Sequence, residues 1–351
     1  MLVDGVAFRS LVGRLEAVER RLEEQQCRVV ADTTSITVVD GDEKWVGGVL
    51  APNGKIYGIP DNAASVLIID PTFNTVDMSV MTGLIGRNKW SGGVLADNGK
   101  IYGIPASATS VLIIDPRSNI TDTNAITGLD DGSSRWFGGV LAANGKIYGI
   151  PYSSSSVLVV DPTTNMTDTT TLSGLGDTDG KWFGGVLART GKIYGIPYFS
   201  EAVLVIDPGT NTLDTFSDLP GIAKWRGGVL AGSGKIYGIP RRSTSILVID
   251  PTTNATDSIM ISNLGDIVQK EQWHGGVLAN NGKIYGMPGN SPSVLIIDPT
   301  TNTTDHDITT ISNMNGTAKW HDGVLANNGR IYGIPHYAQS VLIIRRDCVG
   351  L

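Results

Sequence analysis

Cysteine is almost absent from this sequence, and so are long apolar runs. The 351 residues include 2 cysteines, which are too few for a disulfide framework or a four-thiolate zinc site. Apolar runs such as the one in "SVLIID" end after four or five residues, far short of a transmembrane helix. We therefore expect no membrane partner and no cysteine-based metal centre.

Runs of positive charge are also missing. Lysine and arginine total 27 against 34 acidic residues, and the formal net charge is −7. A protein of this charge has little attraction for a phosphate backbone, so nucleic acid is not expected as a partner. The first 20 residues are interrupted by Asp4, Arg9, Arg14 and Glu16 and do not form a secretion signal. We expect a cytoplasmic protein.

What the sequence does contain is a repeat. Its 7 tryptophans recur at spacings of 45, 46, 46, 43, 48 and 47 residues. Most copies read "W-x-G-G-V-L-A", a turn, "G-K-I-Y-G-I-P", and then "S-V-L-I-I-D-P" or a close variant. A period of this length is typical of propellers and solenoids. The tryptophans that mark the repeats are Trp45, Trp90, Trp136, Trp182, Trp225, Trp273 and Trp320.

Each repeat predicts four short strands. In the second copy they are residues 92–96, 99–105, 110–115 and 120–127. Asn-Gly between the first two strands is typical of a tight hairpin, and Asp-Pro begins the turn after the third. The run "VLII" does not alternate apolar and polar residues, which indicates a sheet buried on both faces. Blades stacked around an axis satisfy that requirement.

The chain's two ends complete one another. The seventh copy stops after its third strand, whereas "ADTTSITVVDGDEKW" near the N-terminus matches the fourth strand of other copies. We therefore predict an all-β, seven-bladed β-propeller over residues 29–351, closed by an N-terminal strand that completes blade seven and removes two exposed edges. The same pairing brings Cys27 near Cys348, as a possible disulfide or as two free thiols.

Residues 1–28 are predicted to form a separate N-terminal segment. Over residues 6–27 the apolar positions follow a 3-4 spacing, which is typical of a short amphipathic helix or a weak coiled coil. This helix would serve oligomerisation or tethering, through a homodimer, docking on the propeller, or binding of another protein. The apolar positions are Phe8, Leu11, Leu15, Val18 and Leu22.

The repeat resembles a known family. "GGVLAPNGKIYGIPDNAASVLIIDPTFNT" is similar to the YVTN-type, Kelch-like propeller repeat, which pairs a "P-[DN]-G-K-x-[VIL]-Y-V" hairpin with a "V-x-V-I-D-x-x-T-N" strand. The resemblance covers residues 30–346. It implies a binding or surface scaffold and supplies no catalytic motif.

Repeats differ most at the residue after each tryptophan and the residue after each "YGIP" or "YGMP". Both positions are expected on the same face of the propeller, where ligands of this fold usually bind. They are aromatic in blades three and four, basic in blade five, and bear histidine in blades six and seven. The predicted ligand-binding residues are Phe137, Tyr152, Phe183, Tyr198, Arg226, Arg241, Arg242, His274, His321 and His336.

Aromatic rings beside arginines suit a planar or anionic small molecule, or an acidic peptide. We expect a non-catalytic scaffold that presents this face to such a small ligand or to a protein. One alternative is a lyase or hydrolase that uses His274, His321 and His336 with Arg241, since imidazoles act as general bases. Another is a structural subunit of a larger assembly. The sequence carries no motif for a cofactor and no metal-ligand spacing, so neither is expected.

Overall fold

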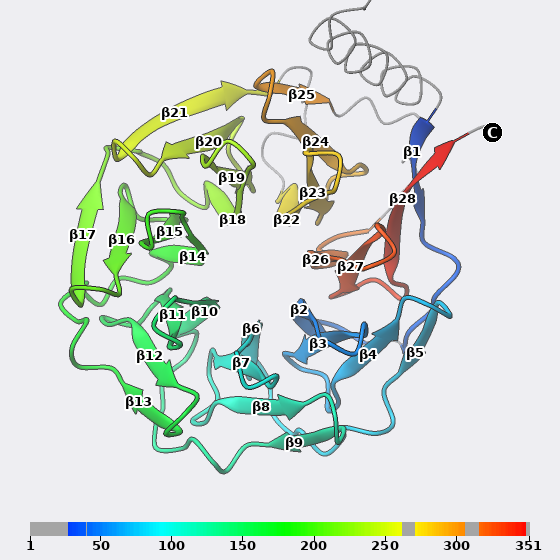
Figure 1. Ribbon diagram of the computed structural model, residues 1–351, viewed down its shortest axis with the longest axis horizontal. Coiled ribbons are helices and arrows are strands. Elements are labelled where there is room, and N and C mark those ends of the chain that lie inside the picture. The colour runs from blue at the N-terminus through cyan, green and yellow to red at the C-terminus, as the bar shows by residue number, and fades with distance from the viewer. Residues whose placement is uncertain (1–26, 40, 262–270, 306–315, 349–351) are drawn as a thin grey trace, which may run out of the picture.

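The computed structural model describes residues 27–39, 41–261, 271–305 and 316–348. They form seven antiparallel sheets of four strands each, arranged as blades around a central axis (Figure 1). The chain is therefore a seven-bladed β-propeller, as predicted. Residues 6–26 of the predicted N-terminal helix lie outside the described residues, whereas Cys27, its last predicted residue, begins a strand with Arg28. Within the described ranges, no helix has the length and apolarity needed to span a membrane.

The strands follow one another outward from the axis within each blade. Blade one contains β2 (Trp45–Leu50), β3 (Ile56–Pro60), β4 (Leu67–Asp70) and β5 (Thr75–Asp77), and blade two contains β6 (Trp90–Leu95), β7 (Ile101–Pro105), β8 (Leu112–Asp115) and β9 (Ile120–Asp122). Blade three contains β10 (Trp136–Leu141), β11 (Ile147–Pro151), β12 (Leu158–Asp161) and β13 (Met166–Asp168), and blade four contains β14 (Trp182–Leu187), β15 (Ile193–Pro197), β16 (Val203–Asp207) and β17 (Thr212–Phe216). Blade five contains β18 (Trp225–Leu230), β19 (Ile236–Pro240), β20 (Ser245–Asp250) and β21 (Ala255–Met260), and blade six contains β22 (Trp273–Leu278), β23 (Ile284–Pro288), β24 (Leu295–Asp298) and β25 (Thr303–Asp305). Blade seven contains β26 (Trp320–Leu325), β27 (Ile331–Pro335), β28 (Leu342–Cys348) and β1 (Cys27–Asp32).

Blade seven is closed by the two ends of the chain. β1 pairs antiparallel with β28, with Asp32 opposite Ile343 and Cys27 opposite Cys348. In Figure 1 the blue β1 lies beside the red β28. The predicted closure is thus present. Directly opposed residues of an antiparallel pair have Cα atoms about 4.5–5.5 Å apart, within the range that a disulfide spans. A bond between the two cysteines remains a prediction.

Glycine pairs allow the innermost strands to converge on the axis. A β-bulge interrupts the register between Trp45 and Gly48 in blade one, and the same irregularity occurs at each innermost strand. A Cβ atom at Gly48 would lie 2.6 Å from Cδ1 of Ile334 in the neighbouring blade. At Gly47, whose φ is +75°, it would lie 3.1 Å from the Cα atom of Gly92. These close approaches leave only a narrow channel along the axis.

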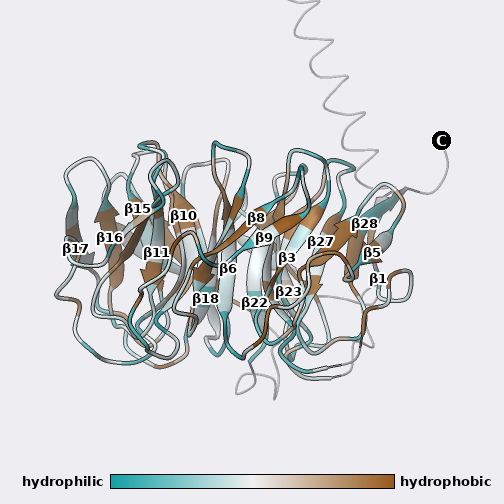
Figure 2. Cartoon of the chain, turned by 90° about the horizontal axis from the view of Figure 1, so that it is seen from below, coloured by the Kyte–Doolittle hydropathy of each residue, from teal (hydrophilic) through white to brown (hydrophobic). Residues whose placement is uncertain are grey.

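The core lies between blades. Trp136 of blade three packs on Val94 and Tyr102 of blade two, and the other junctions repeat this contact. The indole of Trp136 also donates to the Ser156 carbonyl of its own blade at 2.7 Å. Figure 2 shows hydrophobic residues concentrated on the strands, with hydrophilic loops at both faces of the ring.

Most of the predicted strands have the expected position, but the outermost strands are shorter than predicted. The strand expected over residues 120–127 ends as β9 at Asp122. The Asp122 carboxylate accepts hydrogen bonds from the backbone amides of Asn124 and Ala125, at 2.7 and 3.0 Å. An Asp side chain that binds the amides two and three residues further on favours a turn over a strand.

Candidate functional site

Strand pairing gathers the variable positions at one mouth of the axial channel. In every blade the tryptophan that begins the innermost strand lies opposite the proline that ends the next one, for example Trp273 opposite Pro288. The residues that follow these two therefore lie at the same end of the blade. All seven blades place these side chains on one face, around the channel.

Three histidines meet at this mouth. His274 lies in β22, His321 in β26, and His336 directly after β27. The ring centres of His274 and His321 are 5.5 Å apart, and those of His321 and His336 are 5.6 Å apart. The three side chains are buried, with exposed fractions of 0%, 4% and 8%. These three histidines are therefore not exposed loop residues.

Most of the nitrogens in this cluster have no hydrogen-bond partner in the protein. Among the described residues, both ring nitrogens of His274, both of His321 and Nδ1 of His336 are buried and unpartnered. Nε of Arg226 and of Arg241 share that condition. An unsatisfied buried polar group costs about 1–3 kcal/mol, and native structures contain few of them. Their concentration at one place makes this mouth the candidate site for a polar ligand.

Burial also fixes the charge of the cluster. Burial lowers the pKa of His274 and of His321 well below the ordinary value of 6.5, and the positive charge of Arg226 lowers both further. The two imidazoles are therefore neutral at neutral pH. A neutral imidazole offers one basic nitrogen and one N–H donor.

Arg226 and Arg241 bring positive charge to the same mouth. The Cζ atom of Arg226 lies 4.2 Å from the ring centre of Phe183. Burial lowers its pKa to about 10, against the favourable charge of Glu271. No ion pair involves Arg226 within the described ranges. Arg241 differs, because its guanidinium forms an ion pair with Glu271 and lies 5.0 Å from the ring centre of Tyr198. Arg226 is thus the cation that is free to meet an anion.

An aromatic wall completes the cluster on the side of blades three and four. Phe137, Tyr152, Phe183 and Tyr198 pack together, with ring centres of neighbours 4.5 to 6.1 Å apart. Phe183 also reaches across the mouth to His321, at 5.7 Å between ring centres. Aromatic rings and histidines from blades three to seven therefore form one continuous surface.

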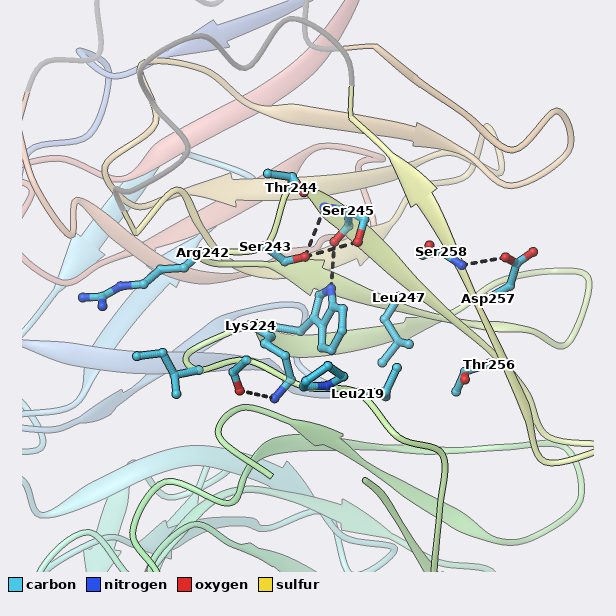
Figure 3. A pocket seen from close by; sticks show the side chains of 14 residues that line it. Leu219, Lys224, Arg242, Ser243, Thr244, Ser245, Leu247, Thr256, Asp257 and Ser258 are labelled. Carbon is cyan, nitrogen blue, oxygen red and sulfur yellow. Dashed lines mark hydrogen bonds between the residues drawn. The ribbon is translucent and has the colours of Figure 1, made fainter. Parts of the chain in front are cut away.

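All the residues singled out from the sequence join this surface except Arg242. Its side chain is 43% exposed and bonds to Glu271 at 3.2 Å. It lines an outer groove of about 590 Å³ between blades four and five (Figure 3). Other polar groups of this groove bond to the chain itself, as Trp225 does to the Ser245 carbonyl. This groove is therefore separate from the histidine cluster.

Three acidic residues at the mouth were not singled out from the sequence. Oδ2 of Asp61 lies 3.9 Å from Nε2 of His336, and Glu271 holds both Arg241 and Arg242. Asp61 occupies the variable position of blade one, so alignment of the repeats exposes it. Glu271 lies two residues before a repeat tryptophan, at the position that Glu43 holds in blade one, and this position also varies between the repeats.

The third acid is Asp322, which replaces the first glycine of the pair in blade seven. It keeps the left-handed backbone of those glycines, with φ of 66°. It lines a chamber of about 70 Å³ together with Phe183, Arg226 and His321. Burial raises the pKa of this carboxyl to about 6. The chamber thus contains a titratable carboxyl and the His321 imidazole.

No metal centre is evident in this arrangement. Within the described ranges, no group of three His, Cys, Asp or Glu side chains is disposed to hold a metal ion. The chemistry available from these residues is proton transfer by imidazole and carboxyl groups, and anion binding by Arg226.

No protein-family profile and no curated protein sequence matches this chain. Solved structures do. A streptogramin B lyase superposes with a TM-score of 0.74 at 11% identity, covering 91% of this chain and 98% of that one. Virginiamycin B lyase from Staphylococcus aureus gives 0.72 at 10% identity, covering 91% and 99%. A catalytically inactive histidine-to-alanine variant of that enzyme with quinupristin gives 0.72 at 10%, covering 90% and 99%.

Other propellers of similar shape have different roles. The extracellular domain of a putative one-component system from B. thetaiotaomicron gives a TM-score of 0.65 at 12% identity, covering 90% of this chain and 42% of that one. Identities this low establish a common fold and nothing about activity. The chain is a seven-bladed β-propeller with the architecture of the streptogramin B lyases.

Proposed function

We propose that the protein is a lyase that acts on a small anionic molecule carrying an aromatic or apolar group. One observation carries the proposal: three buried histidines with unpartnered nitrogens lie beside an arginine that has no carboxylate partner. A propeller that bound nothing at this mouth would not need such a cluster, because each unpartnered nitrogen lowers the stability of the fold.

The residues divide into binding and reacting groups. Arg226 binds the anionic group of the ligand, and the rings of Phe183 and Tyr198 pack against its apolar part. His321 lies at the centre of the mouth, in ring contact with both other histidines, and its neutral imidazole accepts a proton. His336, whose Nε2 atom lies 3.9 Å from Oδ2 of Asp61, provides the second proton-transfer site.

An elimination fits these groups without a metal or a covalent intermediate. His321 removes a proton from a carbon of the ligand, and the electron pair of that C–H bond becomes a new double bond. The bond to the leaving group breaks, and its electrons depart with that group, which the second site protonates. General base catalysis of this kind contributes typically about 10²–10⁴-fold to the rate.

The similarity to solved propeller structures also supports a lyase. The propellers that superpose well include enzymes described as lyases, one of which is inactive when a histidine is replaced by alanine. A hydrolase remains the nearest enzymatic alternative, since a histidine base also activates water.

A second candidate function is ligand binding without chemistry, as the YVTN-type, Kelch-like repeat implies. The aromatic wall of blades three and four favours it, because four packed rings beside Arg241 form a ready surface for a planar ligand. In that case the histidines would orient the ligand by hydrogen bonds alone.

The decisive experiment compares His321→Asn with the unaltered chain. Both are screened by thermal unfolding against streptogramin B compounds, aromatic carboxylates and acidic peptides, and any ligand found is then followed by mass spectrometry for turnover. A ligand at one hundred times its Kd adds about 2.7 kcal/mol to the unfolding free energy. A lyase that opens a ring predicts one product with the mass of the ligand, and a lyase that splits an open chain predicts two products whose masses add up to that of the ligand. In His321→Asn the ligand should still bind, and turnover should be lost.

Binding without turnover in the unaltered chain would establish the second candidate instead. A product carrying one added water per bond broken would indicate the hydrolase. Turnover at an unchanged rate in His321→Asn would remove His321 from the mechanism, and Phe216→Leu, far from the mouth, serves as a control for the effect of substitution itself.

A further inference from the structure

A second feature lies on the opposite face of the ring, where the hairpin turns of neighbouring blades meet. The Tyr57 hydroxyl of blade one donates to the Pro116 carbonyl and to Oδ1 of Asn119, at 3.5 and 3.4 Å. Both acceptors belong to the Asp-Pro-x-x-Asn turn of blade two. The Asn53 amide donates to the same hydroxyl at 2.9 Å and to the same carbonyl at 3.2 Å. Each blade thus holds the turn of the next one.

This junction recurs around the ring. Tyr332 of blade seven reaches Pro71 and Asn74 of blade one, at 3.4 and 3.0 Å. The turn asparagine has a left-handed backbone, as Asn74 does with φ of 52°, which presents its side chain toward the neighbour. At four other junctions a tyrosine or its hairpin asparagine donates to the turn of the next blade. These donors are Tyr102, Asn144, Tyr194 and Tyr237.

The junction between blades six and seven lacks its turn. The third strand of the other blades ends at an aspartate before the turn, whereas β28 continues through Arg345 and Arg346 to Cys348. Tyr285 is the tyrosine of this junction. Its hydroxyl accepts a hydrogen bond from the Asn281 amide at 3.0 Å, and in the described part of the chain no acceptor meets its own proton.

A cavity of about 190 Å³ occupies this place. Its walls are apolar at Val29, Ile331 and Ile344, and its polar groups include the Tyr285 hydroxyl and the Arg346 guanidinium. Arg346 is exposed and forms no ion pair within the described ranges, whereas Arg345 lies 3.7 Å from the carboxylate of Asp32. The cavity therefore offers hydrogen-bond donors and positive charge beside apolar walls.

We infer that this cavity binds an Asp-Pro-x-x-Asn turn supplied by a partner protein. The proline carbonyl and the asparagine oxygen of the turn accept from Tyr285 and Asn281, as they do at the filled junctions. The aspartate of the turn forms an ion pair with Arg346. The proline ring packs on the apolar walls. The site lies on the face opposite the histidine cluster and is independent of the proposed reaction.

The probe for this inference is a cyclic peptide that contains residues 249–256, "IDPTTNAT", the turn of blade five. A fluorescent label reports its binding to the full chain by anisotropy. We expect saturable binding that weakens about fivefold in Tyr285→Phe, the loss that one hydrogen bond predicts. Arg346→Glu replaces attraction by repulsion and should weaken binding about tenfold or more.

The matched control is Tyr237→Phe, which removes the same hydroxyl from a junction that already holds a turn and should leave peptide binding unchanged. A second control is the peptide with lysine for its aspartate and alanine for its asparagine, which should not bind. Thermal unfolding of each variant verifies that the ring is intact.

Three results would overturn the inference. The first is no saturable binding of the peptide at millimolar concentration. The second is binding that Tyr285→Phe and Arg346→Glu leave unchanged. The third is binding that appears only after residues 349–351 are deleted, because the cavity would then belong to the end of this chain.

Discussion

Space for the His274 ring depends on the absence of a side chain at position 289. A Cβ atom at Gly289 would lie 2.8 Å from Nε2 of His274. We predict that Gly289→Ala displaces this ring and weakens ligand binding at the mouth about tenfold, with a stability loss of about 1–3 kcal/mol from overpacking. Ligand titration and urea unfolding measure the two effects.

Ala106 provides the matched control, because it holds the equivalent position of blade two, where no histidine competes for the space. Ala106→Gly should cost about 0.5–1 kcal/mol at most and leave ligand binding unchanged. Equal ligand affinity in Gly289→Ala and the unaltered chain would show that the position of the His274 ring does not affect ligand binding.

Asp322 is unusual in both its backbone and its charge. Burial raises its pKa to about 6, so the folded state disfavours the carboxylate. The cost is absent at pH values below the unfolded pKa of about 3.9, grows as the pH rises from there to the folded value of about 6, and is complete above it. We predict that Asp322→Gly stabilises the fold, by about 1 kcal/mol from the backbone alone, and by more at pH 8 than at pH 4.

Urea unfolding at the two pH values measures this difference, and Asp322→Asn separates the effects of charge and backbone. Asp322→Asn should retain the pH-dependent increase in the unfolding free energy, which comes from removal of the carboxylate. It should lack most of the pH-independent increase, which comes from the backbone freedom of glycine. A gain that is equal at both pH values would exclude a buried carboxylate.

The repeat alignment predicted which positions face the mouth, because residues after Trp and after Pro share one end of every blade. It could not predict that His321 and Phe183 touch across the axis, since the reach of side chains between blades depends on channel width. Glu271 was missed for a related reason: the repeats align and vary two residues before each tryptophan, but an alignment does not show that this carboxylate reaches Arg241 of the preceding blade.

At the scale of the element, the lysines that precede the tryptophans join adjacent blades. The Nζ atom of Lys89 lies 5.9 Å from the Trp90 ring centre. Its ammonium also donates to the carbonyls of Asp61, Ala63 and Gly86, at 2.5, 3.0 and 2.9 Å. Backbone carbonyls leave no mark in a sequence, so these bonds could not be predicted.

We predict that Lys89→Met destabilises the ring by about 2 kcal/mol, because buried carbonyls of two blades lose a charged donor. Lys100→Met is the control: Lys100 is exposed on the opposite face, and its loss should change the unfolding free energy by less than about 0.5 kcal/mol. Equal effects in urea unfolding would show that the three bonds contribute nothing.

The whole molecule should lose stability in acid in two stages. The pKa values of His274 and His321 are lowered by burial, so below about pH 6.5 the unfolded chain takes up protons that the folded chain refuses. The free energy of unfolding therefore keeps its full value above that pH and falls as the pH decreases, by about 1.4 kcal/mol per pH unit for each histidine. Asp32, with a pKa lowered to about 2 by hydrogen bonds that outweigh its burial, adds a second loss below about pH 4.

Urea unfolding between pH 4 and 8 measures the first stage, and the double variant His274→Gln/His321→Gln should lack it. Retention of the full slope between pH 5 and 6.5 in that variant would assign the proton uptake to other groups. The second stage should persist, because the aspartates of the turns are unchanged.

The closure of blade seven also bears on how many blades such a chain can have. In the described structure every third strand except β28 is followed along the chain by its own fourth strand. β28 also differs from the other third strands in sequence, because it continues through Arg345 and Arg346 to Cys348 and pairs with β1 over that extension. Connectivity and this extension together select the partner of β1. A gene that gained or lost one complete repeat would still encode a single vacancy for its first strand, so the size of the ring can change in whole-blade steps during evolution without a new closing device.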